Sequence, residues 1–235
     1  MLQCKALVLE QGNFKLSMDL AFVPQVITAL VGPSGAGKST LLAALAGFLA
    51  PAEGRILYED KDLTQLSPGS RPISILFQDH NLFPHLTIAQ NVGLAIAPRL
   101  RLGVADQARV SEVLTRVGLE GMESRRPAAL SGGQQSRAAL ARVLLADRPV
   151  VLLDEPFAAL GPALRRDMLD LVKDTLTGAG RTVIMVTHDP ADARRVADET
   201  VLVADGRAAP PLATETLFAT PPPALAAYLG ETSKS

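Results

Sequence analysis

The chain has 235 residues and a formal net charge of −1, and 48% of its residues are hydrophobic. This length suffices for one large domain or two small ones, and the near-neutral charge gives no general reason to bind nucleic acid or anionic lipid. Cys4 is the single cysteine, so no internal disulfide can form and a cytoplasmic location is expected. The N-terminal pattern and the polar interruptions of the stretch from His80 to Pro98 predict neither a secretory signal nor a membrane span.

The first predicted elements are two antiparallel strands, at Leu7–Leu9 and at Phe14–Phe22, where hydrophobic residues alternate. Later apolar runs are typical of buried strands: Val26–Val31, Ile73–Phe77, Val150–Leu153, Thr182–Val186 and Thr200–Val203. Helical patterns at Lys38–Phe48 and Pro162–Thr177 lie between some of these runs. The alternation predicts an α/β fold with a mostly parallel sheet that is covered by helices.

The segment from about residue 79 to residue 147 has a different pattern. It shows no strand signal, and helical periodicity covers residues 105–117 and 133–146. We interpret this segment as a helical insert within a single domain that spans residues 1–235. The tail at 209–230 is rich in Pro and Ala and predicts short peripheral helices.

A glycine-rich loop lies between the first buried strand and the helical pattern that follows it. Its residues are Gly32, Pro33, Ser34, Gly35, Ala36, Gly37, Lys38, Ser39 and Thr40. Such glycines let the backbone curl so that its N–H groups point at phosphate oxygens. Lys38 would reach the β- and γ-phosphates, and the Ser39 hydroxyl would ligate Mg²⁺. The loop predicts a nucleoside triphosphate site, and a chance glycine turn is a weak alternative because every fixed position is present.

The strand in VVLLDEP ends in two acidic residues, Asp154 and Glu155. Side chains alternate along a strand, so the two carboxylates point in different directions. This suits Asp154 to hold Mg²⁺, usually through water, and Glu155 to polarise an attacking water. Two acids after a strand can also form a plain polar turn. The phosphate loop in the same chain favours the functional interpretation, with hydrolysis rather than transfer to an organic hydroxyl.

A second glycine loop, LSGGQ, contains Ser131, Gly132, Gly133 and Gln134 and precedes a helical pattern. Ser131 is a favourable N-cap, and the glycines expose backbone N–H groups at a helix start. The loop has no lysine and no metal ligand, so it could complete a triphosphate site but could not form one. Simple helix capping is the alternative.

Together the motifs resemble those of the ATP-binding subunits of ABC transporters, over essentially the whole chain. Besides GPSGAGKST, LSGGQ and VVLLDEP, they include Gln78 in LFQDHNLFPHLT and His188 in VIMVTHDP. The resemblance implies an ABC ATPase domain: a P-loop NTPase with a RecA-like core, an N-terminal antiparallel β subdomain and a helical insert. It also implies ATP and Mg²⁺ as cofactors, with Gln78 near Mg²⁺ or the attacking water. His188 would bond the γ-phosphate and orient Glu155 or the water.

The resemblance further implies partners. Two subunits would pair head to tail, so that each ATP lies between the phosphate loop of one and the LSGGQ of the other. The homodimer would bind membrane permease subunits and, through them, a periplasmic substrate-binding protein, but no nucleic acid. It would lie peripherally on the cytoplasmic face of the bacterial inner membrane. Phe83, Pro84 and Leu86 would line the groove for a permease helix, with ordinary packing as the alternative.

Two positions depart from the family pattern. Family members usually stack adenine on an aromatic residue near the N-terminus, and here Phe14 is the only aromatic residue in that region, a few positions late. The loop after VVLLDEP usually ends in Asp, and here Gly161 takes that place. The contacts that this Asp makes across the dimer are therefore open.

The segments AGFLAPAEGRI, RPISILFQDHNLFPHLTIAQNVGL and DEPFAALGPALR resemble the ATP-binding subunits of bacterial thiamine importers. Importer ATPases for iron, molybdate, sulfate or polyamines share much of this pattern, so the transported compound is open. An ABC ATPase of DNA repair or translation and a small-molecule kinase are rival classes. The net charge and the single cysteine disfavour the first, and LSGGQ with Glu155 disfavours the second.

Overall fold

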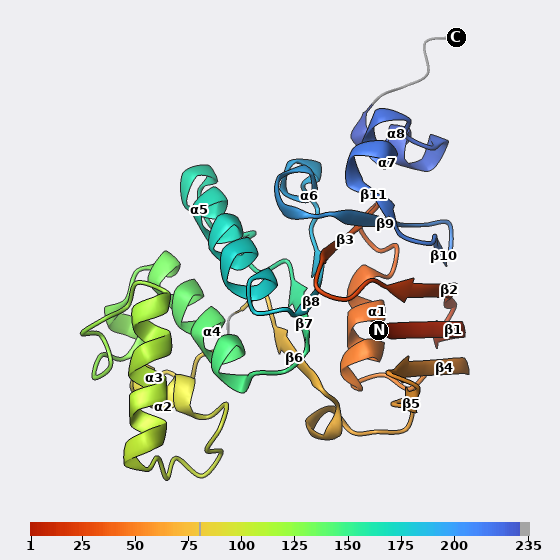
Figure 1. Ribbon diagram of the computed structural model, residues 1–235. Coiled ribbons are helices and arrows are strands. Elements are labelled where there is room, and N and C mark those ends of the chain that lie inside the picture. Colours follow the sequence, from red (N-terminus) through yellow and green to blue (C-terminus); the bar gives the residue numbers. More distant parts are fainter. Residues whose placement is uncertain (80, 231–235) are drawn as a thin grey trace.

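The computed structural model describes residues 1–79 and 81–230, in which strands and helices alternate along most of the chain (Figure 1). The strands are β1 Leu2–Gln11, β2 Phe14–Phe22, β3 Ile27–Val31, β4 Glu53–Tyr58, β5 Lys61–Asp62, β6 Ile73–Leu76, β7 Val150–Asp154, β8 Thr182–Val186, β9 Glu199–Ala204, β10 Arg207–Ala208 and β11 Leu212–Ala213. The α-helices are α1 Lys38–Ala46, α2 Ile88–Gly93, α3 Val104–Arg116, α4 Gly132–Ala146, α5 Pro162–Val172, α6 Pro190–Val196, α7 Thr214–Ala219 and α8 Pro223–Leu229. Short 3₁₀ turns occur at Pro68–Ser70 and Pro127–Ala129, and a π-helical turn, Lys173–Thr177, continues α5.

The strands pair in the order β5-β4-β1-β2-β10-β9-β3-β8-β7-β6, and β11 pairs with β9. The run β9-β3-β8-β7-β6 is parallel throughout. Its strands β3, β7 and β8 are apolar and buried along nearly their whole length, as expected for a sheet that is covered on both faces. Val151 and Leu153 pack on the side of the helical segment, whereas Val150 and Leu152 pack toward α1. Because successive side chains of β7 point to opposite faces of the sheet, this strand contributes residues to two cores.

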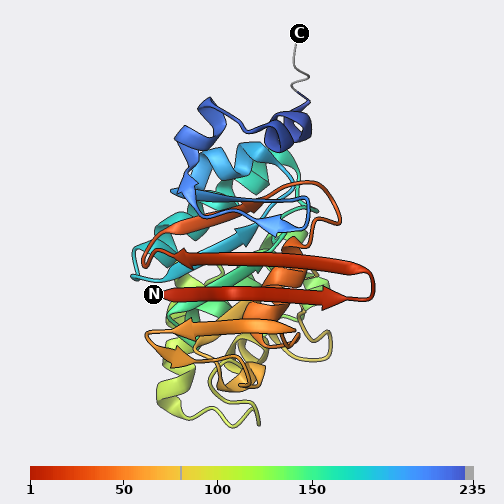
Figure 2. The ribbon, with the colours of Figure 1, turned by 90° about the vertical axis from the view of Figure 1, so that its right-hand side faces the viewer.

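The N-terminal strands form an antiparallel part, with β1 paired to β2 and β4, and β4 paired to β5. Figure 2 shows β1 and β2 in front of α1, and the leucines of α1 pack between these strands and the parallel ones. Cys4 is fully buried in this layer, and burial raises the pKa of its thiol to about 12.

The helical segment lies at the opposite side of the parallel strands from the antiparallel part (Figure 1). Helices α2, α3 and α4 pack on one another, and α4 packs on the edge strand β6. Among the described residues between 79 and 147 there is no strand. The predicted fold class is therefore confirmed, while the boundaries of the insert stay a prediction. His80 and residues 231–235 of the predicted domain lie outside the described residues.

The structure differs from the sequence-based prediction mainly at the edges of elements. Strand β1 begins at Leu2, well before the predicted Leu7, and strands β4, β5, β10 and β11 were not predicted. The EGRILY sequence of β4 shows no clean alternation, and its pairing with β1 decides its conformation. In the tail, α7 and α8 pack with α6 over β3 and β9. No helix in the part of the chain that the structure describes is long and apolar enough to cross a membrane.

A buried arginine caps the C-terminal end of α1 by hydrogen bonds to its carbonyl groups. Arg71 is 1% exposed, and burial lowers the pKa of its guanidinium. It donates to the carbonyls of Ala44 and Leu45 at 2.7 and 2.8 Å, and to those of Leu66 and Thr64 at 2.9 and 3.1 Å. The last carbonyls of a helix have no partner within the helix, so this side chain supplies donors that α1 lacks.

We expect Arg71→Met to lower the free energy of unfolding by about 2–4 kcal/mol. Of the four carbonyls that lose this donor, that of Ala44 still accepts from the Gly47 N–H at 3.2 Å. A carbonyl left without a donor costs about 1–3 kcal/mol, and the sum over the others outweighs the several kcal/mol regained by no longer burying a charge. Urea unfolding followed by circular dichroism measures the change. Arg55→Met is the matched control, because Arg55 is exposed and its contact with Asp62 is 3.9 Å long. Equal stability of the two variants would contradict the role of Arg71.

Candidate nucleotide-binding site

The glycine-rich loop connects β3 to α1, as predicted. Gly32 has a φ of 147°, and a Cβ there would lie 2.0 Å from the carbonyl oxygen of Val203. Gly37 has a φ of 100°, and its Cβ would lie 2.4 Å from the ring of Phe14. Both positions therefore need glycine, for backbone conformation and for space. The tight loop leaves its N–H groups at the start of α1, where a helix favours an anion.

Lys38 lies under this loop and is 6% exposed. Its Nζ donates to the carbonyls of Gly32 at 2.7 Å and Pro33 at 2.9 Å. Burial lowers the pKa of Lys38, and the nearby carboxylates of Glu155 and Asp154 oppose that shift. The ammonium group is thus held within the curl of the loop, close to two acids.

A cavity of about 260 Å³ opens beside the loop. Its lining comprises Gln11, Phe14, Ser34, Gly35, Gly37, Lys38, Ser39, Thr40 and Glu155. The loop residues come from one end of α1, and Gln11 and Phe14 come from the turn between β1 and β2. Phe14 is therefore the aromatic residue that the structure brings to the phosphate loop.

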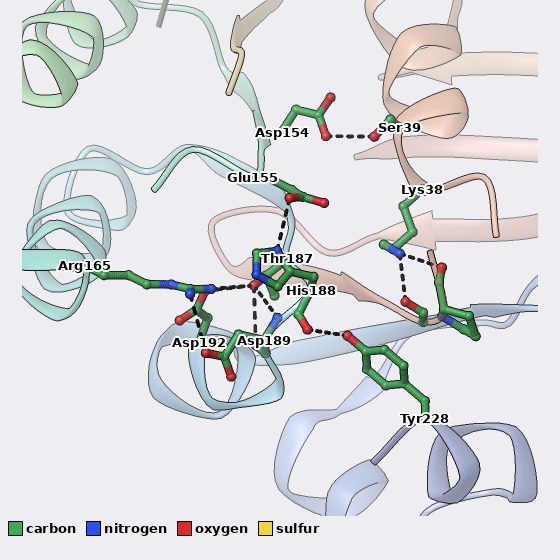
Figure 3. A network of polar contacts seen from close by, with 12 residues as sticks. Lys38, Ser39, Asp154, Glu155, Arg165, Thr187, His188, Asp189, Asp192 and Tyr228 are labelled. Atoms are coloured by element: carbon green, nitrogen blue, oxygen red, sulfur yellow. Dashed lines mark hydrogen bonds and ion pairs between the residues drawn. The ribbon is translucent and has the colours of Figure 1, made fainter. Parts of the chain in front are cut away.

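Asp154 and Ser39 meet across the site, although 115 residues separate them in the chain. The Ser39 hydroxyl donates to Asp154 Oδ1 at 3.0 Å (Figure 3). Burial raises the pKa of Asp154, while the hydrogen bond from Ser39 and the charge of Lys38 act in the opposite direction. A hydroxyl and a carboxylate form the hard oxygen donor set that Mg²⁺ prefers. Among the described residues no group of three acidic, histidine or cysteine side chains is suited to hold a metal.

Glu155 and His188 form the second contact across the strand ends. His188 Nδ1 lies 3.1 Å from Glu155 Oε2 (Figure 3). Glu155 has a φ of 45°, a left-handed conformation that is uncommon for a residue with a side chain, and its N–H donates to the Val186 carbonyl at 3.2 Å. Strain of this kind clusters at functional sites, and here the strained residue contacts His188, whereas its neighbour Asp154 contacts Ser39.

A polar network surrounds His188, and three of its members were missed in the sequence. Arg165 Nε donates to Asp192 Oδ2 at 3.0 Å, and the Thr187 hydroxyl bonds the same oxygen at 2.8 Å. Arg165 also pairs with Asp189 at 3.5 Å. The Tyr228 hydroxyl donates to the His188 carbonyl. Arg165 is the last residue of DEPFAALGPALR, Asp192 follows VIMVTHDP by two positions, and Tyr228 lies far from every motif. In the sequence, only the acidic Asp189 next to His188 could have suggested an ion pair.

Gln78 and the LSGGQ loop lie apart from the cavity lining. Gln78 is exposed in the turn after β6, and pairing of Leu76 with Leu153 places it at the same strand edge as Glu155. Ser131 caps α4, with its Oγ accepting from Gln134 N at 3.3 Å and its N–H donating to Gln134 Oε1 at 3.0 Å. Ser131 and Gly132 are exposed, and none of the five LSGGQ residues lines the cavity. The predicted roles of all these residues stay predictions.

Comparisons with known proteins agree with this geometry. Residues 16–158 match the family described as ABC transporter. A thiamine import ATP-binding protein from Cereibacter sphaeroides is 60% identical over 98% of this chain and 100% of its own length. A protein of the same description from a Ruegeria species is 54% identical with the same coverage. The chain therefore belongs to the ABC transporter family, and it is an ATP-binding cassette.

Solved structures give the same fold. An ATP-binding cassette solved as a dimer in a post-hydrolysis state, with ADP and phosphate bound, superposes with a TM-score of 0.77 and 29% identity, over 91% of this chain and 99% of that chain. A component of an ABC transporter complex from Clostridium perfringens gives a TM-score of 0.81 at 30% identity, over 93% of this chain and 90% of that chain. Cassettes of this family are thus known as dimers.

The structure shows what Gly161, which takes the place of the usual Asp, does in this chain. Gly161 is the N-cap of α5 with a φ of −64°, no side chain caps the helix, and a Cβ there would meet open space. We therefore expect Gly161→Ala to leave the ATPase rate near its original value and to lower the free energy of unfolding by no more than about 1 kcal/mol, because Ala is a poorer N-cap than Gly. Gly161→Asp adds an acceptor for the free N–H groups of α5 and raises the free energy of unfolding by a few tenths of a kcal/mol. Thermal unfolding and ATPase assays check both, and a large loss of ATPase rate in folded Gly161→Ala protein would show that this glycine has a mechanistic role.

Proposed function

We propose that this chain is the ATP-hydrolysing subunit of a bacterial thiamine importer, and that it couples ATP binding and hydrolysis to uptake through a membrane permease. The observation that carries the hydrolytic part is the contact of Glu155 with His188 at 3.1 Å beside the phosphate loop. The substrate rests on the thiamine import ATP-binding proteins that match nearly the full chain at 60% and 54% identity.

In this proposal the phosphate loop and Lys38 hold the β- and γ-phosphates of ATP, and Phe14 lies where the base could stack. Ser39 and Asp154 would hold Mg²⁺, with Gln78 as a further oxygen donor at the same strand edge. When bound, the ion would neutralise charge that develops on the phosphates.

Glu155 would act as the general base, accepting a proton from the water that attacks the γ-phosphorus. The bond to His188 restricts the carboxylate to one orientation. In its protonated form His188 has a donor on each ring nitrogen, so it could hold Glu155 through Nδ1 and a γ-phosphate oxygen through Nε2. In this step the water oxygen would form a bond to the γ-phosphorus while the bond between that phosphorus and the bridging oxygen of ADP breaks. Glu155 would take the proton of the water, and ADP and inorganic phosphate would leave.

A second copy of the chain would complete the site. The LSGGQ loop presents exposed backbone at the start of α4, yet it does not line the cavity of its own chain. A head-to-tail homodimer would bring the Ser131, Gly132, Gly133 and Gln134 of one copy to the nucleotide of the other. Permease subunits would bind the dimer at the cytoplasmic face of the inner membrane, and a periplasmic binding protein would act through them. The exposed side chain of Phe83, a few residues after Gln78, suits such a contact.

We expect Glu155→Gln to slow ATP hydrolysis by about 10²–10⁴-fold, because the amide keeps the shape but cannot accept the proton. ATP then stays bound between two copies and acts as a ligand of the paired state alone. Size-exclusion chromatography should show a dimer with ATP and Mg²⁺ and a monomer with ADP.

The control for this experiment adds Ser131→Arg to Glu155→Gln. A bulky charged side chain at the exposed Ser131 blocks the approach of the loop to a partner's nucleotide, so this double variant should remain monomeric with ATP. If it dimerises as readily as Glu155→Gln, the LSGGQ loop is only a helix cap in this chain.

The substrate is tested in cells. Deletion of the gene in a thiamine auxotroph should abolish growth on low external thiamine, the intact gene should restore growth, and Lys38→Ala should not restore it because the lysine that holds the phosphates is gone. Normal thiamine uptake in the deletion strain, with loss of iron or polyamine uptake, would reject thiamine and leave the ATPase assignment intact.

A further inference from the structure

The last described helix reaches the residue that contacts the general base. Tyr228, on α8, donates its hydroxyl to the main-chain carbonyl of His188. In the view of Figure 3, Tyr228 and Glu155 lie on opposite sides of His188. The hydrogen bond joins residues that are 40 positions apart in the chain, so α8 and the loop after β8 are coupled through it.

His188 needs such a support because the regular sheet ends just before it. The last pairing of β8 with β3 joins Val186 to Leu30, and the N–H of Thr187 reaches the Leu30 carbonyl only at 3.4 Å. The imidazole itself is about half exposed, with a side-chain exposure of 48%. Because few neighbouring atoms hold an exposed ring in place, its direction depends strongly on the backbone that carries it. For His188 this backbone is the peptide on either side of the residue.

Packing of its helix against an apolar cluster holds Tyr228 in position. Leu225 of the same helix is fully buried, and Tyr228 and Leu229 pack on the cluster that contains Ala29, Val31 and Phe218. Burial raises the pKa of the Tyr228 hydroxyl, and the charges of Asp189 and Glu155 raise it further, so the group remains a donor at neutral pH. Val31 directly precedes the phosphate loop, so one apolar cluster connects α8 to the strand that positions the phosphates.

We propose that Tyr228 is a positioning residue for ATP hydrolysis, which holds the His188 carbonyl so that the imidazole faces Glu155. The inference rests on the function proposed above, in which Glu155 is the general base. Tyr228 neither lines the cavity nor contacts Glu155 directly, so its effect on the reaction passes through the backbone of His188.

The test uses Tyr228→Phe, which keeps the ring packed on its cluster and removes only the donor. We expect kcat for ATP hydrolysis to fall about three- to tenfold, the value of one hydrogen bond, with KM for ATP unchanged. Tyr58→Phe is the matched control. Tyr58 is the other tyrosine of the chain and lies on β4, so this variant should keep the original kcat.

A second readout is independent of activity. The chain has three histidines, and NMR of the full-length protein with labelled histidine rings should show the His188 ring signals shifted in Tyr228→Phe. The signals of His85, in the helical segment, should stay in place, and Tyr58→Phe should move neither set.

The two readouts together decide the proposal. A lower kcat with shifted His188 signals supports it, and a change in only one of them, or in neither, overturns it. The proposed function is tested separately by Glu155→Gln and His188→Ala in the same assay. If those variants hydrolyse ATP as fast as the original chain, the general-base assignment fails, and a shifted His188 signal then records only a structural contact.

Discussion

Parallel pairing places the ends of β3, β6, β7 and β8 at one edge of the sheet, and the whole site depends on that register. Leu30 lies opposite Val186, and Val186 lies opposite Asp154, so the phosphate loop, His188 and Glu155 follow one another at neighbouring strand ends. A slip of one residue would turn the apolar faces of these strands around. The packing of two cores therefore also sets the spacing of the charged groups.

Burial shifts the pKa values of two charged side chains in this site in opposite directions. It lowers the pKa of Lys38 and raises that of Asp154, so in each case the charged form is the less favoured one. Each group is compensated locally, Lys38 by two loop carbonyls and Asp154 by the Ser39 hydroxyl. A triphosphate offers Lys38 stronger acceptors than a carbonyl, and a cation offers Asp154 a stronger partner than a hydroxyl. In the proposed function both groups would therefore contribute binding energy, and a ligand that binds only the folded chain stabilises it.

The fold class and the phosphate loop could be predicted because both rest on local patterns. The strands β3, β7 and β8 are continuous apolar runs, which can be recognised without knowing their neighbours. The loop needs glycine at defined positions such as Gly32 and Gly37. Other features depend on contacts between distant residues. No pattern near Arg71 shows that it closes α1, and nothing around Tyr228 indicates a bond to His188. The strand β4 was missed for the same reason, since its partner β1 decides its conformation. The roles assigned to Gln78 and LSGGQ concern a nucleotide and a second copy, so one chain does not test them.

The backbone beyond the strand ends is irregular wherever it forms the site. Gly32, Gly37 and Glu155 all have positive φ, and the strand pairing of β8 ends at Val186. Backbone groups that lose ladder partners must be satisfied by side chains or water. Around His188, Arg165 on α5 contacts Thr187 and Asp189 of VIMVTHDP and also Asp192, and Tyr228 on α8 donates to the His188 carbonyl. The parallel sheet brings Ser39, Glu155 and His188 near one another, and in the proposed role of Tyr228 a contact from a distant helix restricts the direction in which His188 points.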